Sequence, residues 1–237
     1  GDIVLFGESL ELLTITMNGK VLNTEDYQQE AGKLTIYNAP ERATLDIQVR
    51  ICPQTNTALE GLYMAGSGDD TMFVTQCEPE GFRKITFYPD RPDVLAIFTT
   101  RLEADKRYPT LFACVVADLD VLTDSYTTSE GREVLLELYA KSADIDKCDV
   151  GMQALKDAMK WDEVNYGRAY DLDRYMIVAV SQFNMGAMEN KGLNIFNTAC
   201  VLSSPETTTD ARSFSVKAII AHEYFHNWTG NRITCRD

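Results

Sequence analysis

The sequence predicts an α+β protein with two successive domains, an all-β sandwich-like domain over residues 1–120 and a mixed α/β domain over residues 121–237. Two observations lead to this prediction. In the first half, short runs of β-branched and aromatic residues alternate with turn signals, which is typical of antiparallel sheets. In the second half, apolar residues at helical spacing appear between further strand-like runs. The change of pattern places the boundary near residue 120.

The composition suits these two domains. The 237 residues are 45% hydrophobic and 24% charged, which is ordinary for a globular protein with a sizeable core. Acidic residues outnumber basic ones by 36 to 22, for a formal net charge of −14. Such a field repels phosphate backbones and anionic lipid surfaces, so we expect neither nucleic acid nor membrane as a partner. No run approaches the roughly 20 apolar residues of a membrane helix.

The first half contains a hairpin signal and several predicted strands. Asn18-Gly19 lies between apolar runs, and this dipeptide favours a tight two-residue turn because both residues tolerate positive φ. Helical periodicity is absent from this half of the sequence. The predicted strands are residues 12–16, 34–37, 43–49, 84–88, 95–100 and 112–117.

The second half mixes strands and helices. Met152, Leu155 and Met159 follow the i, i+3, i+7 spacing of an amphipathic helix, which we predict over residues 150–165. Strands are predicted at residues 133–139, 175–181 and 193–196.

A last helix is predicted near the end of the sequence. Thr209 or Asp210 can cap its start, because a short polar side chain accepts a hydrogen bond from a free backbone N–H of the first turn. The helix is expected to run to a stop at Gly230.

The cysteines favour free thiols over disulfides. They lie at wide spacings without a CxxC pair, and most have apolar neighbours, so we expect buried thiols and a reducing, cytoplasmic location. The six are Cys52, Cys77, Cys114, Cys148, Cys200 and Cys235.

The strongest chemical signal is the stretch His222-Glu223-xx-His226, which contains both histidines of the chain. Four residues return a helix to nearly the same face, so the two imidazoles can converge on one zinc ion. Glu223 can then reach a water on that ion and act as a general base. The alternative is a chance match, with both imidazoles capping a helix or pairing with carboxylates.

Longer stretches resemble one family. SQFNMGAMENKGLNIFN at 181–197, followed by HEYFHNWTGNRITCRD at 222–237, resembles the aminopeptidase N family of zinc metallopeptidases, and its bacterial cytosolic branch more than the membrane-anchored members. The resemblance continues upstream through NTALEGLY at 56–63, TQCEPEGFR at 75–83 and DRPDVLAIFTT at 90–100. It implies a saddle-like β domain, then the first part of a thermolysin-like catalytic domain that acts on peptides with a free N-terminus.

The resemblance also implies substrate-binding residues. The glutamate of the GAMEN motif, Glu189, and a glutamate of the β domain, Glu78, would hold the substrate's α-ammonium group, with Gln76 beside them. Carboxylates at a fixed distance from the metal measure one residue inward from a free amine. The backbone of the GAMEN motif would pair with the substrate, and a methionine would line the first side-chain pocket; the matching residues are Met185, Gly186 and Ala187.

Parts of the family pattern have no counterpart here. A catalytic zinc takes three protein ligands plus water, and the family's third ligand is a glutamate on the order of twenty residues past the second histidine. The sequence stops at Asp237, before that position and before the tyrosine that stabilises the oxyanion. Relatives also have a longer segment near residues 108–112. We therefore expect a portion of a longer protein that alone binds zinc weakly and does not turn over peptides.

Three other functions fit less well. A scaffold that has lost the metal motif disagrees with the intact His222 and His226. An epoxide hydrolase of the bifunctional kind has glycine where this sequence has Ala187. A purely structural zinc module would keep its zinc after Glu223→Gln, whereas the same change would greatly lower the rate of catalysis.

Overall fold

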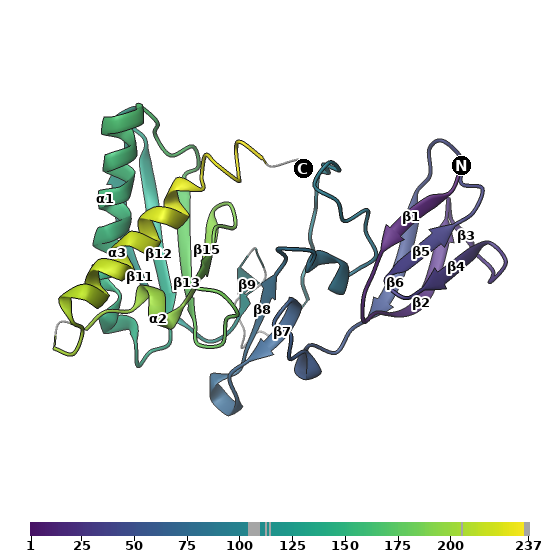
Figure 1. The fold of residues 1–237 in the computed structure, drawn as a ribbon, viewed down its shortest axis with the longest axis horizontal. Helices are drawn as coiled ribbons and strands as arrows, with labels where there is room; N and C mark the ends of the chain where they lie inside the picture. The colour runs from purple at the N-terminus through teal and green to yellow at the C-terminus, as the bar shows by residue number, and fades with distance from the viewer. Residues whose placement is uncertain (104–109, 112, 114, 205, 235–237) are drawn as a thin grey trace. The chain divides into compact units, whose positions relative to one another are not determined.

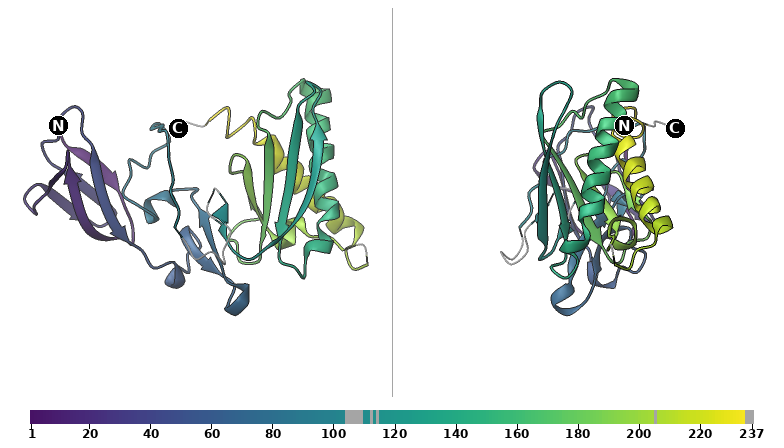
Figure 2. Two further views of the ribbon diagram at one scale, coloured as in Figure 1. Left: turned by 180° about the vertical axis from the view of Figure 1, so that it is seen from behind. Right: turned by 90° about the vertical axis from the view of Figure 1, so that its left-hand side faces the viewer.

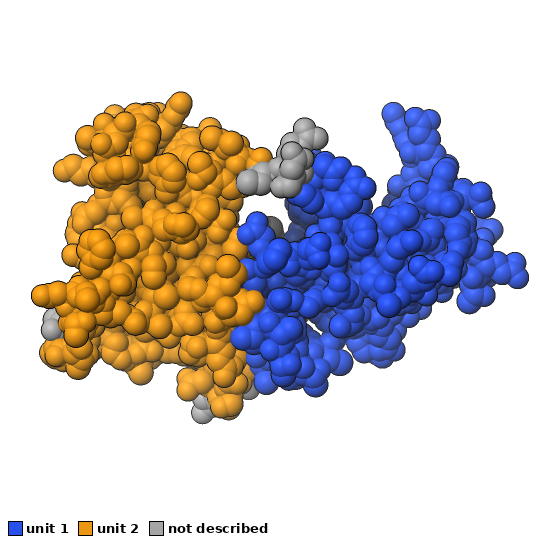
Figure 3. Space-filling model, in the orientation of Figure 1, with its two compact units in different colours: residues 1–64, 73–101, 236–237 blue, residues 65–72, 102–235 orange. Residues whose placement is uncertain are grey.

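The computed structural model describes residues 1–103, 110–111, 113, 115–204 and 206–234. These residues form two compact units (Figure 3). The first consists of residues 1–64 and 73–101, and the described part of the second consists of residues 65–72 and those from 102 onward. The domain boundary at residue 120 stays a prediction.

Two three-stranded sheets build most of the first unit. One has the order β1-β5-β4, with β1 at Ile3–Phe6, β5 at Lys33–Ile36 and β4 at Tyr27–Glu30. The other has the order β3-β2-β6, with β3 at Lys20–Val21, β2 at Glu11–Met17 and β6 at Leu45–Arg50. All their pairings are antiparallel. The sheets share one apolar core that contains Leu5, Ile15, Leu34, Ile36 and Phe87.

The predicted hairpin is present. Asn18 and Gly19 have φ of 53° and 80°, as a turn with two left-handed residues requires, and they join β2 to β3. The strands predicted at 12–16, 34–37 and 43–49 correspond to β2, β5 and β6. Two further strands of this half, β7 at Gly61–Ala65 and β8 at Met72–Gln76, alternate buried and partly exposed side chains.

Two predicted strands are wrong. Residues 84–88 contain the end of a 3-10 turn, Phe82–Lys84, and make only an isolated bridge from Tyr88 to Phe6. Residues 95–100 form no strand, and Ile97 is fully exposed. These runs have β-forming composition, but composition cannot supply a partner strand. Of the strand predicted at 112–117, Val115–Val116 is β10, which pairs with β9 at Thr110–Leu111; residues 112 and 114 lie outside the described residues.

A five-stranded mixed sheet forms the frame of the second unit. Its order is β11-β12-β13-β15-β14: β11 is Asp120–Thr127, β12 Glu133–Ala140, β13 Arg174–Val180, β15 Leu193–Asn197 and β14 Ala187–Met188. The central pairs β12/β13 and β13/β15 are parallel, and the outer pairs are antiparallel. Most of β13 and β15 is buried, as expected for parallel strands covered on both faces. The predicted strands at 133–139, 175–181 and 193–196 are confirmed.

Two long helices lie side by side on one face of this sheet (Figures 1 and 2). Helix α1 is Asp149–Tyr166 and ends at Gly167, whose φ is 62°. It buries Met152, Leu155 and Met159, as their spacing predicts. The short helix α2 is Thr198–Val201. The all-β to α/β fold class is thus confirmed.

Helix α3, Asp210–Phe225, starts as predicted but ends earlier. The Thr209 hydroxyl accepts a hydrogen bond from the Arg212 N–H at 3.3 Å. The predicted stop at Gly230 is wrong, because the chain leaves the helix at His226 and folds back through a compact loop. Gly230, with φ of 112°, donates its N–H to the Ile233 carbonyl at 3.0 Å and closes that loop.

The described cysteines are Cys52, Cys77, Cys148 and Cys200, and all four are free thiols. Cys148 is buried as expected, whereas Cys52 is exposed. Cys114 and Cys235 lie outside the described residues. No helix in the described ranges is long and apolar enough to span a bilayer.

A buried carboxyl group on α1 makes stability depend on pH. Asp162 is 2% exposed, and this burial raises its pKa from 3.8 to about 6, although the Trp228 indole acts in the opposite direction. The neutral form of Asp162 is therefore favoured in the folded state. Because the unfolded chain gives up this proton at a lower pH than the folded chain, the free energy of unfolding falls as the pH rises from about 4 through 6.

We predict that Asp162→Asn raises the free energy of unfolding more at pH 8 than at pH 5, by on the order of 1 kcal/mol. Urea unfolding at the two pH values measures this difference. Asp157→Asn, an exposed position on the same helix, is the matched control. An equal increase in the free energy of unfolding at both pH values would show that the pKa of Asp162 is not raised in the folded protein.

Candidate functional site

The last turn of α3 presents the predicted motif. Val216, Ile220 and Tyr224 are buried on the sheet side of the helix and fix its rotation about its own axis. This rotation places Glu223 on the inside, with 7% of its surface exposed, and leaves His222 at the exposed edge. His226 is the residue at which the helix ends.

The imidazole of His226 has a defined orientation. Its Nδ1–H donates to the Thr229 carbonyl at 2.6 Å, inside the loop that follows α3. In the neutral imidazole this hydrogen bond makes Nε2 the acceptor nitrogen, and Nε2 lies within hydrogen-bonding distance of Nε2 of His222, at 3.1 Å. The two rings are nearly perpendicular, at 84°. The Nε2 atoms of both histidines thus point at one another, and each can offer a lone pair to a metal ion once the proton between them is lost.

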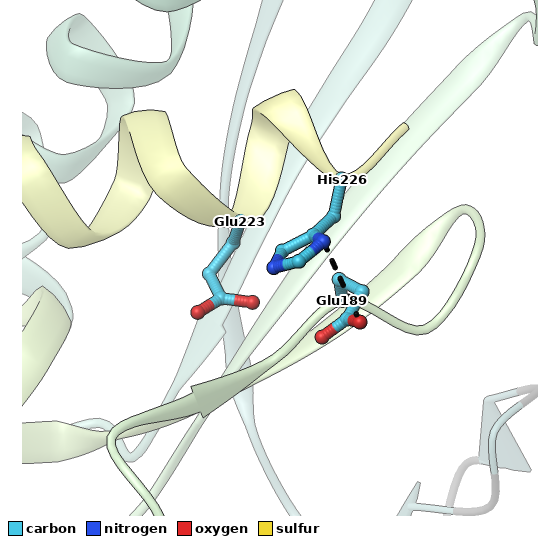
Figure 4. A group of neighbouring side chains, drawn as sticks. All are labelled: Glu189, Glu223 and His226. Carbon is cyan, nitrogen blue, oxygen red and sulfur yellow. Dashed lines mark ion pairs between the residues drawn. The ribbon is translucent and has the colours of Figure 1, made fainter. Parts of the chain in front are cut away.

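Glu189 approaches the same histidine from the sheet. It directly follows β14, in the hairpin that leads to β15, and its Oε1 lies 3.7 Å from Nδ1 of His226. The Glu189 carbonyl accepts a hydrogen bond from the Asn231 side-chain amide at 2.8 Å. Figure 4 shows Glu189 on the hairpin beside Glu223 of α3 and His226, the residue that follows this helix.

Glu223 is the group with the most perturbed acidity in the site. Burial, and secondly the nearby Glu189 carboxylate, raise its pKa to about 7, while His226 partly offsets the rise. Its Oε2 is buried and has no hydrogen-bond partner among the described residues. A carboxylate with a pKa near neutrality and an unoccupied acceptor atom is suited to exchange a proton with a bound molecule.

The potential metal ligands can be grouped in two ways. One group consists of Glu189, Glu223 and His226, whose ligand atoms all lie within 4.8 Å of one another. The other is the predicted pair, His222 and His226. Zinc–nitrogen bonds of about 2.0–2.1 Å at a tetrahedral angle place two nitrogens about 3.3 Å apart. The observed 3.1 Å between the Nε2 atoms fits one shared ion.

The remaining residues of the GAMEN motif form an edge of the sheet. Ala187 pairs with Phe196, and the Gly186 carbonyl accepts from the Asn197 N–H at 2.9 Å. Because β14 is the last strand of the described sheet, its other side is not paired within that sheet. Met185, just before this strand, is 47% exposed.

Gln76 and Glu78 belong to the first compact unit. Gln76 is fully buried at the end of β8, and its side-chain amide donates to the Glu78 carbonyl at 2.9 Å. Their joint action with Glu189 stays a prediction.

Sequence reasoning missed three residues that shape the site. The Thr229 carbonyl accepts a hydrogen bond from His226, and the Asn231 side chain donates one to the Glu189 carbonyl. Gly230 lies against the side chains of both His226 and Glu189. A Cβ atom on Gly230 would lie 3.2 Å from His226 Nδ1 and 3.5 Å from Glu189 Oε1. All three follow the second histidine directly, and the only signal for them was the glycine in that segment.

An HExxH helix packed on a mixed sheet, with a carboxylate on the neighbouring edge hairpin, is an arrangement that metallopeptidases use. Comparison with known families agrees. A family model described as "Peptidase M1 N-terminal domain" matches residues 4–129, and one described as "Peptidase family M1 domain" matches residues 150–237. The chain therefore belongs to peptidase family M1.

Individual relatives extend this result. The chain is 49% identical to aminopeptidase N of Escherichia coli and 46% identical to that of Caulobacter vibrioides, over 98% and 99% of its length. It spans about 30% of each of these relatives. A crystal structure of Legionella pneumophila aminopeptidase A in complex with aspartic acid matches with a TM-score of 0.86 at 30% identity, over 100% of this chain and 31% of that one. These matches confirm the resemblance drawn from the motifs.

Proposed function

We propose that the full-length protein is a zinc-dependent aminopeptidase that removes single residues from the free N-terminus of peptides. The observation that carries the proposal is the convergence of His222 and His226 at 3.1 Å beside the buried Glu223. Membership of peptidase family M1 and the similarity to two bacterial aminopeptidases N support it. Because the chain spans about 30% of those relatives, further residues of the full-length protein contribute to the activity.

In this proposal the two Nε2 atoms are zinc ligands. The bond from His226 Nδ1 to the Thr229 carbonyl fixes the tautomer that can bind a metal. Zinc, when bound, supplies a Lewis acid that polarises the scissile carbonyl and makes water more acidic. The sequence contains this histidine pair but not the later glutamate of the family pattern, so we propose that this stretch by itself binds zinc weakly and is inactive.

Glu223 acts as the general base. Its free Oε2 takes a proton from the attacking water, and the same carboxyl then donates it to the leaving amine. A pKa of about 7 in the metal-free site is close to what both transfers need at neutral pH. Burial excludes bulk water, so the proton stays on this carboxyl between the two steps.

Glu189 binds the substrate's α-ammonium group. Its Oε1 lies 3.7 Å from Nδ1 of His226. A substrate ammonium group bound to this carboxylate would therefore place the first peptide bond near the metal ligands. Ala187 on the outermost strand β14, and Gly186 just before it, pair with the substrate backbone, and the exposed Met185 contacts the first side chain.

The net charge of −14 is compatible with cationic peptide termini and disfavours nucleic acid and anionic membranes as partners. The four free thiols support a reducing, cytoplasmic location.

The two possible ligand groups predict opposite effects of two variants on zinc affinity. We predict that His222→Ala lowers zinc affinity of the full-length protein at least tenfold, because it removes a ligand. Glu189→Gln should leave zinc affinity nearly unchanged, because Glu189 binds substrate instead. Competition with a chromogenic chelator measures both affinities. The opposite pattern would assign the metal to Glu189, Glu223 and His226.

We predict that Glu223→Gln lowers kcat by at least a hundredfold, because the amide keeps the side-chain shape but cannot accept the proton. Zinc content, measured by atomic absorption, should remain at the wild-type level. A variant with wild-type kcat would exclude Glu223 as the base, and a parallel loss of zinc and kcat would identify it as a ligand.

A further inference from the structure

Three segments of the second unit meet at one charged side chain outside the catalytic motif. Asp171 lies in the connection between α1 and β13, Lys191 in the β14–β15 hairpin and Asn227 in the loop after α3. Lys191 Nζ lies 2.6 Å from Asp171 Oδ1 and also donates to the Asn227 side-chain oxygen. The Asn227 amide in turn donates to Asp171 Oδ1 at 3.3 Å. The three side chains close a triangle.

The triangle joins the two segments that contain the proposed site. Lys191 is two residues from Glu189, and Asn227 directly follows His226. Asn231 forms a second link between the same two segments. Its side-chain amide donates to the Glu189 carbonyl, and its backbone N–H donates to the His226 carbonyl at 3.2 Å. The hairpin and the loop are therefore tied at two points close to the Glu189–His226 contact.

The surroundings strengthen these contacts. The Asp171 and Lys191 side chains are each only 31% exposed, and Asn227 is 3% exposed, so solvent screens the ion pair less than at an open surface. Lys191 Nζ also lies 5.5 Å from the centre of the buried Tyr170 ring, and Arg232 Nε lies 3.8 Å from Asp171 Oδ2.

We propose that Asp171 is a positioning residue that, through Lys191 and Asn227, sets the distance between the Glu189 carboxylate and the His226 imidazole. This inference rests on the proposed aminopeptidase function, in which that distance determines where a bound N-terminus lies relative to the metal ligands. Asp171 itself does not contact the substrate. A change in this distance moves the ammonium-binding carboxylate relative to the metal ligands, so a lock on the distance is expected to affect how tightly a free N-terminus is bound.

Steady-state kinetics of the full-length protein on an aminoacyl amide provide the first test. Asp171→Asn should raise KM about tenfold with kcat within about threefold of wild type, because the ammonium site shifts while Glu223 is unchanged. Lys191→Met should raise KM by a similar factor, whereas Lys191→Arg, which keeps the charge, should leave KM near the wild-type value. The double variant Asp171→Asn/Lys191→Met should have a KM no higher than that of either single variant. Asp173→Asn, in the same connection and 89% exposed, is the matched control.

A purely structural role gives a different result. If the substitutions only reduce the fraction of folded protein, the apparent kcat would fall with that fraction and KM would stay unchanged. Additive effects on KM in the double variant would show that Asp171 and Lys191 act independently. Either result would overturn the proposal.

Hydrogen exchange provides a test that does not depend on activity. Asp171→Asn should speed amide exchange in residues 186–193 and 226–233 together, including the Leu193 amide bonded to the Asn190 carbonyl at 2.9 Å. Unchanged exchange in both segments would overturn the lock. If the wild-type protein hydrolyses no amide but both segments loosen, the proposed function fails and the lock stands.

Discussion

The hydrogen bond from His226 Nδ1 to the Thr229 carbonyl is the contact on which the site depends. It requires α3 to end at Phe225, because a continuing helix would use the backbone groups of these residues internally. It directs Nε2 toward His222, and it gives the loop the shape that brings Asn231 to Glu189. The position of one helix end thus determines both the geometry of the metal ligands and the position of the ammonium-binding carboxylate.

The sequence predicted those elements whose own residues determine their structure. The start of α3 follows from the Thr209 cap, α1 from its apolar spacing, and the first hairpin from Asn18-Gly19. The strand predicted at 95–100 failed because pairing depends on a distant segment, which local composition does not encode. The end of α3 was misplaced for a different reason, since hydrogen bonds within the loop that directly follows it outweigh helix propensity.

The same division holds at the site. His222, Glu223, His226 and Glu189 could be named in advance because their chemistry is tied to short motifs. Asp171 could not, because it meets Asn227 across 56 positions of sequence and has no motif of its own. Residues that support a site often come from distant parts of the sequence and meet only in the folded chain, so the structure is needed to find them.

The most direct test of the account is hydrolysis of a chromogenic aminoacyl amide by the full-length protein, with the α-amine free or acetylated and with or without a chelator. We predict cleavage of the free amine alone, lost with the chelator and restored by zinc, because recognition needs an ammonium group and catalysis needs the metal. Equal cleavage of both substrates would contradict the role of Glu189, and chelator-resistant cleavage would contradict zinc catalysis at His222 and His226.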